Sequence, residues 1–311
     1  MVEVTHLSLG TWQISLPFQG EPGIVGTYLL AGANEIALID PGPGSTSEAL
    51  LEGVRQLGFD PAEITHLIAT HVHLDHAGAT GTLLQQMPNA RVYAHKAGAP
   101  HLINPSRLVS SAQRIYGDRM QQLWGKIEPV PEDRVQIIGD GDILRVANQR
   151  LEVHYAPGHA IHHIILFNAH TGELHAGDAA GVRLQDIDYV RPPTPPPDLD
   201  LEAWSATIDN IKRLRPDVLY LAHFGPTRNP DQHCEQLREK LFSWGDFVLN
   251  ALHEGKNETQ IIDMLIAQNE PKLRRVAHDD QALKRYEIAT NYAMTVQGYI
   301  RYWKKKHPER L

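Results

Sequence analysis

Three histidines and one aspartate lie within six residues, in the segment 71–76 that reads His-Val-His-Leu-Asp-His. The short, largely apolar run at 66–70 before it predicts a buried strand, and the helix formers that follow at 77–87 favour a helix. The cluster is therefore expected at the end of a strand, where α/β folds bind their ligands. Imidazole and carboxylate groups together suit zinc, iron, manganese or nickel.

The order of these side chains favours two groups of metal ligands. His71 and His73 are two residues apart and can point the same way on an extended backbone. Asp75 and His76 follow on the turn into the helix and can face a second ion. The alternative is a polar loop that holds no ion, but packing alone explains such a cluster of histidine and aspartate poorly.

The same residues resemble the His-x-His-x-Asp-His signature of the metallo-β-lactamase superfamily of metallo-hydrolases. The other signature residues follow in chain order at the ends of strand-like runs, as Pro157-Gly158-His159, Gly177-Asp178 and Ala222-His223. Four such motifs in order make a specific match. The resemblance covers about residues 1–230 and implies an α/β fold, the four-layer αβ/βα sandwich of that superfamily.

The resemblance also implies a set of seven metal ligands shared by two divalent ions. One group is expected to hold the first ion, another the second, and one aspartate to bridge them: His71, His73 and His159; Asp75, His76 and His223; and Asp178. Zinc is the expected ion, with iron or manganese as alternatives. Two such ions can share a hydroxide that attacks a carbonyl or phosphorus, while one ion holds the oxyanion. Asp75 is also the expected catalytic residue, because its free oxygen can orient the nucleophile and carry a proton to the leaving group.

Two further residues are expected to support the ligands. Asp40 ends the strand-like run 35–40, and relatives carry a comparable aspartate-glycine turn near their metals. His163 lies four residues after His159, where the family often has a second histidine, and is expected to be a supporting hydrogen-bonder. The neighbouring His162 has no such match and is expected to be incidental.

Differences from named subfamilies narrow the range of expected substrates. Antibiotic-hydrolysing members of the best-known class have a cysteine where this chain has Asp178, which argues against β-lactamase activity. Lactonases have a tyrosine shortly after the bridging aspartate, whereas this chain has alanine and glycine at 179–181 and a tyrosine only at Tyr189. Thioesterases of the glyoxalase II type share the ligand set. The chain most resembles uncharacterised prokaryotic members that have the same Gly-Asp-Ala-Ala-Gly-Val-Arg and proline-rich run.

We therefore expect a metal-dependent hydrolase of a small-molecule ester, thioester or lactone. A phosphodiesterase or nuclease is the first alternative, and basic residues at the metal mouth, with Arg183 and Arg191 as candidates, would indicate it. A non-hydrolytic iron protein, such as a sulfur dioxygenase, is the second.

The segment 183–198 is expected to form a wall of the active site. It begins five residues after Asp178, and five of the six residues at 192–197 are prolines, which favours a stiff, extended backbone. The side chains that could contact substrate are Arg183, Tyr189 and Arg191. Alternatively, the arginines pair with surface carboxylates such as Asp186 or Asp188, and the prolines only carry the chain to the next helix.

Composition agrees with a soluble globular enzyme. The chain has 311 residues, 42% of them hydrophobic and 21% charged. Its net charge of −8 disfavours nucleic-acid binding, which usually needs a basic face. The single cysteine, Cys234, excludes an internal disulfide and a thiolate cluster. The start of the chain lacks the pattern of a signal peptide, and no apolar run is long enough to cross a membrane, so we expect a cytoplasmic protein.

The pattern divides the chain into a catalytic domain at 1–230, with a helical insert at about 96–132, and a C-terminal helical region at 231–311. The insert either forms part of the active-site wall or packs on the core as an extra layer. Ser45 and Glu48 read as a capping box before a helix. Helical patterns in the last region cover 233–252, 259–269 and 280–305, and we expect these helices to dock on the catalytic domain and contribute to a homodimer.

Overall fold

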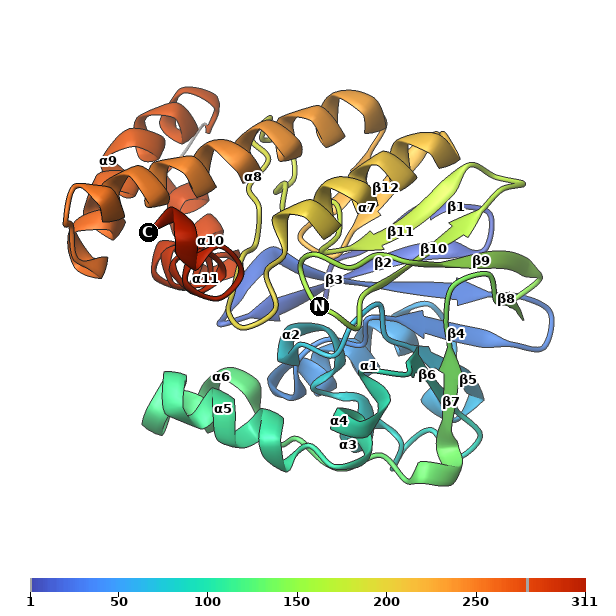
Figure 1. The fold of residues 1–311 in the computed structure, drawn as a ribbon. Coiled ribbons are helices and arrows are strands. Elements are labelled where there is room, and N and C mark those ends of the chain that lie inside the picture. Colours follow the sequence, from blue (N-terminus) through green and yellow to red (C-terminus); the bar gives the residue numbers. More distant parts are fainter. Residues whose placement is uncertain (1, 278–279) are drawn as a thin grey trace.

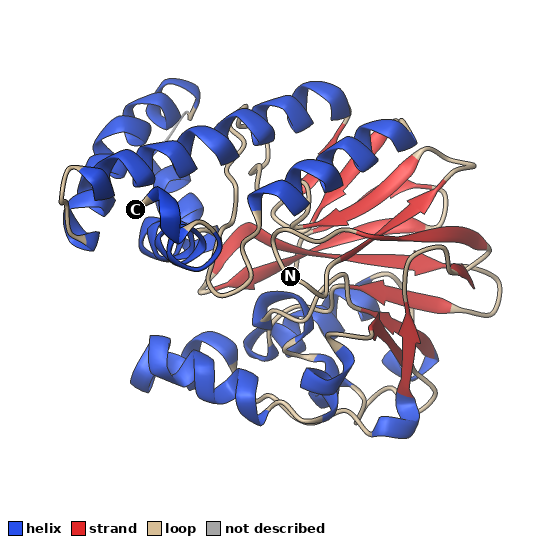
Figure 2. Cartoon of the chain, viewed as in Figure 1, coloured by secondary structure: helices blue, strands red, loops and turns tan. Residues whose placement is uncertain are grey.

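Two β-sheets pack face to face at the centre of the computed structural model, which describes residues 2–277 and 280–311. Helices cover the outer face of each sheet, so the molecule has four layers (Figures 1 and 2). The α/β sandwich with C-terminal helices that the sequence predicted is confirmed.

The first sheet has seven strands in chain order: β1 (Val4–Ser8), β2 (Thr11–Phe18), β3 (Glu21–Ala31), β4 (Ile36–Ile39), β5 (Ile64–Ile68), β6 (Arg91–His95) and β7 (Val135–Ile138). Strands β1 to β4 pair antiparallel, whereas β4 to β7 pair parallel. The parallel strands direct their carboxyl ends to one edge of the sheet, where binding sites of α/β folds form.

The second sheet has six strands in the order β13-β12-β11-β10-β9-β8. Their bounds are β8 (Ile143–Val146), β9 (Gln149–Tyr155), β10 (Ile164–Asn168), β11 (Glu173–Gly177), β12 (Val218–Leu221) and β13 (Gly225–Thr227). Only β11 and β12 pair parallel within this sheet. Their carboxyl ends therefore lie side by side.

The helices fall into three sets. Those near the first sheet are α1 (Ser47–Gln56), α2 (Leu74–Ala77) and α3 (Thr80–Leu83), and the insert contributes α4 (Ala99–Ile103), α5 (Ser106–Tyr116) and α6 (Met120–Trp124). The second sheet is covered by α7 (Leu201–Leu214) and by the C-terminal α8 (Pro230–His253), α9 (Glu258–Val276) and α11 (Tyr292–Lys306), whereas α10 (Asp280–Ala289) packs against β3 of the first sheet. Short 3-10 turns lie at Gly44–Thr46, Pro61–Glu63, Gly117–Arg119, Glu132–Arg134 and Pro308–Arg310. Each helix within residues 2–277 and 280–311 is too short or too polar to cross a membrane.

Three apolar layers hold these elements together. Between the sheets lies a cluster that includes Ile39, Ile68 and Leu166, all almost fully buried. Helix α1 buries Leu50 and Val54 against the outer face of the first sheet. On the other side, α7, α8, α9 and α11 share one apolar cluster with the second sheet. The C-terminal helices therefore dock on the rest of the chain; a homodimer stays a prediction.

Two local predictions were wrong. The helix α1 begins at Ser47 without a side-chain cap, and the Ser45 hydroxyl donates instead to the carbonyl of Leu123 in the insert, 2.7 Å away. The predicted helix 280–305 is two helices, because the Asn291 side chain accepts a hydrogen bond from the Met294 amide and starts α11 afresh.

Candidate metal centre

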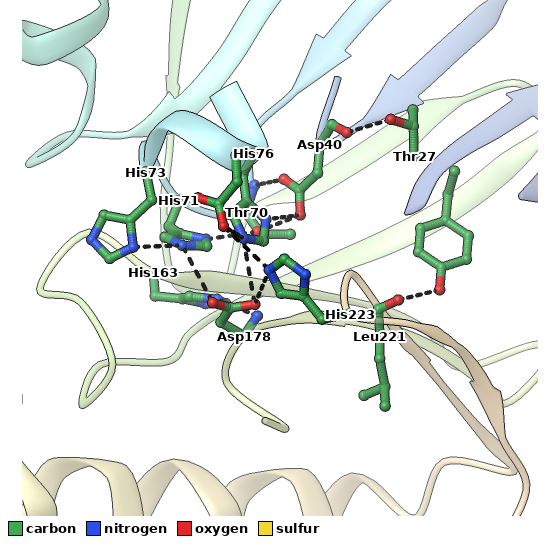
Figure 3. A network of polar contacts seen from close by, with 12 residues as sticks. Thr27, Asp40, Thr70, His71, His73, His76, His163, Asp178, Leu221 and His223 are labelled. Atoms are coloured by element: carbon green, nitrogen blue, oxygen red, sulfur yellow. Dashed lines mark hydrogen bonds and ion pairs between the residues drawn. The ribbon is translucent and has the colours of Figure 1, made fainter. Parts of the chain in front are cut away.

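The seven side chains predicted as metal ligands meet at one edge of the sandwich. Four of them lie just beyond β5 and into α2, and the other three follow β9, β11 and β12: His71, His73, Asp75, His76, His159, Asp178 and His223. Residues from distant parts of the sequence converge there because these strands end at the same edge. Figure 3 shows the part of this network around Asp178.

The first group consists of three imidazoles. His73 Nδ1 lies 3.0 Å from His71 Nε2 and 2.9 Å from His159 Nε2. Two nitrogen ligands of one tetrahedral zinc ion, each at about 2.0–2.1 Å, would be about 3.3 Å apart. The three nitrogen atoms are thus spaced nearly as a single ion requires.

The second group contains Asp75, His76 and His223. Asp75 Oδ2 is 3.3 Å from His223 Nε2 and 3.8 Å from His76 Nε2. Asp178 lies between the two groups (Figure 3). Its Oδ2 is 3.4 Å from His159 Nε2, while its Oδ1 is 3.4 Å from His76 Nε2 and 3.6 Å from His223 Nε2. Each carboxylate oxygen therefore faces one group, as a bridging ligand would.

Unpaired buried atoms test whether these residues fit a metal. His76 Nε2, His223 Nε2 and Asp178 Oδ1 are buried and have no hydrogen-bond partner among the described residues. Buried polar atoms are nearly always paired, so three such atoms facing one point need an explanation. A divalent cation would satisfy all three, and this donor set of nitrogen and carboxylate oxygen suits zinc, iron or manganese. The residues therefore fit a metal ion.

Backbone carbonyls fix two of the imidazoles in the form that binds a metal. His159 Nδ1 donates to the Pro193 carbonyl at 2.8 Å, and His223 Nδ1 donates to the Ile24 carbonyl at 2.7 Å. Because a carbonyl only accepts hydrogen bonds, each Nδ1 carries the proton and each Nε2 presents its lone pair to the centre.

Asp40 is connected by hydrogen bonds to one histidine of each group. Its Oδ1 accepts a hydrogen bond from the Thr70 amide at 2.8 Å, and its Oδ2 accepts from Thr70 Oγ1 at 2.7 Å and from His76 Nδ1 at 3.0 Å (Figure 3). Since the Thr70 hydroxyl already donates to Asp40, it can accept from His71 Nδ1, 3.2 Å away. One carboxylate thus contacts His76 directly and His71 through Thr70, and the supporting role of Asp40 stays a prediction.

His163 contacts the backbone of the aspartate that faces both groups. The Asp178 amide donates to His163 Nε2 at 3.1 Å. Gly177 leaves room for this contact, because a Cβ there would lie 2.5 Å from Thr70 Oγ1 and 2.8 Å from His163 Nε2. Sequence reasoning missed Thr70, although it directly precedes the histidine motif, and it gave Gly177 no role beyond the motif.

Charge differs between the two groups. Burial, followed by neighbouring imidazoles, lowers the pKa of His71 well below its usual value and that of His73 to about 3, so both stay neutral as metal binding requires. In the second group burial lowers the pKa of His76 and His223, but the Asp178 and Asp75 carboxylates outweigh it and raise both. The two carboxylates therefore favour positive charge in this group, which a bound cation would supply.

A cavity of about 370 Å³ opens beside the ligand candidates, and five of the seven line it: His73, Asp75, His159, Asp178 and His223. Its walls come from the insert, from residues 193–198 and from the turn between α10 and α11. The wall predicted from the proline run is thus present in this part of the segment, and the insert contributes as well. His162, expected to be incidental, also lines the cavity, and its Nδ1 accepts from the Val72 amide at 3.4 Å.

The three side chains predicted to contact substrate do not line this cavity. Arg183 lies 3.9 Å from Asp188, as the alternative interpretation expected, although its backbone amide donates to the His223 carbonyl. Arg191 is 1% exposed and stacks on the Tyr292 ring at 3.7 Å. Tyr189 is buried beneath C-terminal helices. Tyr189 and Arg191 do not reach the cavity because the C-terminal helices α8, α10 and α11 pack over the part of the segment that contains them.

The chain is similar to known proteins in family, in sequence and in fold. The family model of the Metallo-beta-lactamase superfamily matches residues 20–223. A metallo-beta-lactamase fold-containing protein from Sulfurisphaera tokodaii is 25% identical over 224 residues, which are 70% of this chain and 80% of that protein. A metallo-beta-lactamase family protein of known structure from Thermus thermophilus has a TM-score of 0.72 and 23% identity, covering 97% of this chain and 95% of its own. That likeness concerns the fold.

Two relatives have named activities but match over shorter regions. An N-acyl homoserine lactonase from Rhizobium johnstonii is 30% identical over 114 residues, 36% of this chain and 39% of the lactonase. A hydroxyacylglutathione hydrolase from Acaryochloris marina is 29% identical over 152 residues, 47% of this chain and 46% of that enzyme. Each match spans less than half of the relative.

Proposed function

The chain belongs to the metallo-beta-lactamase superfamily, and we propose that it hydrolyses a carboxylic ester, thioester or lactone with the help of two divalent metal ions. The observation that carries the proposal is the convergence of His71, His73 and His159 on one point, and of Asp75, His76 and His223 on another, with one Asp178 oxygen facing each. When bound, two such ions supply a hydroxide nucleophile at neutral pH and a Lewis acid for the carbonyl oxygen.

The protein's own residues hold and orient this centre. Asp75 and Asp178 both line the cavity but differ in exposure, since the Asp75 side chain is 22% exposed and that of Asp178 is 4% exposed. Asp75 is therefore the carboxylate that can receive a proton at Oδ and pass it to a leaving group in the cavity. The more buried Asp178, with one oxygen facing each group, would hold both ions.

Charge in the cavity favours a carbonyl substrate over a phosphodiester. Among the described residues that line it, Arg107 is the only arginine or lysine. Proteins that bind the phosphodiester backbone of nucleic acids usually contact its phosphates with several lysine and arginine side chains. The related lactonase and hydroxyacylglutathione hydrolase point the same way, because their names describe a lactone and an acylated thiol as substrates.

Metal content and substrate class test the proposal together. We expect two ions per chain by elemental analysis of metal-repleted protein, and hydrolysis within a panel of chromogenic esters, thioesters and lactones. Asp178→Ala should lower occupancy and activity together, because it removes an oxygen from both groups. A single ion per chain would refute the dinuclear centre. Hydrolysis of bis-phosphodiesters alone would overturn the substrate class, and an iron content without any hydrolysis would favour the non-hydrolytic alternative.

A further inference from the structure

The cavity beside the candidate centre is built by parts of the chain that are far apart in sequence. Figure 1 shows the insert helices α5 and α6 on the same side of the molecule as α10 and α11. The cavity lies between these two pairs and reaches down to His73, Asp75 and His159. A substrate carbonyl placed at this floor would have the rest of its molecule between the helices.

One wall is a regular face of α5. Leu108, Ser111, Ala112, Ile115 and Tyr116 all line the cavity, and their spacing of three and four residues places them on one side of the helix. This face is mostly apolar, yet Ile115 is 49% exposed. A helix normally buries such a face, so its position along a cavity indicates a surface that an apolar ligand would cover.

The remaining walls are mostly apolar, although Arg107, Asp198 and Asn291 also line them. Phe18 and Tyr116 flank Trp124, with ring centroids 5.2 Å from it in each case. On the opposite side Ile288 and Met294 line the cavity, and Ile161, which is 53% exposed, stands at its edge. A volume of about 370 Å³ with a polar floor and apolar walls is typical of a small-molecule site.

We propose that this cavity is an acyl-chain pocket, which makes the substrate an ester, thioester or lactone of an apolar acyl group with a chain of several methylenes. The inference rests on the proposed function and specifies its substrate class. In the reaction, water adds its oxygen to the acyl carbon, the bond from that carbon to oxygen or sulfur breaks, and a proton passes to the leaving group. The acyl chain remains between α5 and α11 until the carboxylate product leaves.

The first experiment measures kcat/KM of the metal-loaded enzyme for p-nitrophenyl esters from acetate to dodecanoate. Each added methylene should raise kcat/KM by up to about fourfold until the pocket is filled, because each buries apolar surface. Ile115→Ser should lower the ratio of octanoate to acetate activity at least threefold, and Ser111→Trp should shorten the preferred chain. The matched control is Ile137→Ser, since Ile137 is a 57% exposed isoleucine on β7 outside the cavity.

The second experiment needs no activity. Calorimetry with decanoate and metal-free protein should detect binding that Ile115→Ser weakens and Ile137→Ser leaves unchanged. If no ester is hydrolysed but decanoate binds in this way, the proposed hydrolysis fails and the pocket stands. Hydrolysis that does not depend on chain length, or equal effects of the two serine variants in both assays, would overturn the pocket.

Discussion

Gly298 provides a sharp test of whether the C-terminal helices position the candidate centre. It lies in α11, and a Cβ at this position would be 1.7 Å from the Thr194 carbonyl oxygen. Thr194 follows Pro193, whose carbonyl accepts the hydrogen bond from His159 Nδ1. A substitution that pushes Thr194 should therefore displace the acceptor that holds a predicted metal ligand.

The size of the effect of Gly298→Ala follows from these distances. Ordinary contact begins at 3.4 Å, so helix and loop must separate by 1.7 Å, which is 3.4 minus 1.7. A shift of even half that size at Pro193 would stretch its 2.8 Å hydrogen bond to His159 beyond a normal length. Loss of such a supporting contact typically costs 10- to 100-fold in metal affinity. The overpacking itself should cost about 1–3 kcal/mol of unfolding free energy.

The assay measures metal affinity by competition with a chelator, and unfolding free energy by urea titration of the same samples. Gly245→Ala is the matched control, because Gly245 lies in the neighbouring α8 and its Cβ would meet side chains and no backbone atom, with Leu201 at 3.1 Å and the Tyr299 ring at 3.3 Å. We expect that variant to bind metal like the wild type. Unchanged metal affinity in a destabilised Gly298→Ala would refute the link through Pro193, and an equal loss in both variants would indicate general loosening.

Three further predictions concern single side chains. Burial lowers the pKa of His175 to about 3, so the folded protein keeps it neutral while the unfolded chain binds a proton below its ordinary pKa of about 6.5. Between pH 7 and pH 5 the wild type should therefore lose about 2 kcal/mol more unfolding free energy than His175→Phe, measured by urea titration at each pH. The control Tyr28→Phe keeps His175 and should lose as much unfolding free energy as the wild type. An equal loss in all three proteins would contradict a neutral, buried His175. Asp40→Asn should weaken metal binding about 10- to 100-fold, because it alters the contact with His76. Competition with a chelator measures the affinity, and wild-type affinity in this variant would show that Asp40 does not support the ligands. Arg191→Met should lower unfolding free energy by about 1–3 kcal/mol with KM unchanged for the best substrate, and a raised KM at full stability would restore the original substrate prediction.

The sequence predicts which residues meet at the candidate centre because each of them follows a recognisable local pattern. Each predicted ligand lies just beyond a short apolar run, and such runs become strands whose ends share one edge. The spacing within 71–76 places His71 and His73 before a turn of helix, so that Asp75 and His76 face a different point. These features depend on neighbouring residues only, and for that reason they could be predicted.

Contacts between distant segments could not be predicted in the same way. Arg191 and Tyr189 are close to Asp178 in sequence and have polar heads, which favoured a substrate role. Helices 50 to 100 residues further along the chain cover them, with Lys240 over the Tyr189 ring and Tyr292 beneath Arg191. Hydrophobic periodicity predicted that those helices have apolar faces, but it does not specify which surface they cover.

The proline run 192–197 suits a segment that packs against α11, because it has few backbone amides that need hydrogen-bond partners. A loop buried between α11 and the ligand candidates would normally leave backbone amides without partners, at a cost for each. In 192–197 only Thr194 has an amide hydrogen, because the other five residues are prolines. Their carbonyls remain free to accept, and Pro193 uses its carbonyl to hold His159. The prolines therefore do more than stiffen the segment: residues 192–194 lie buried beside the candidate centre with Pro193 as an acceptor, and only Thr194 among them has an amide donor that needs a partner.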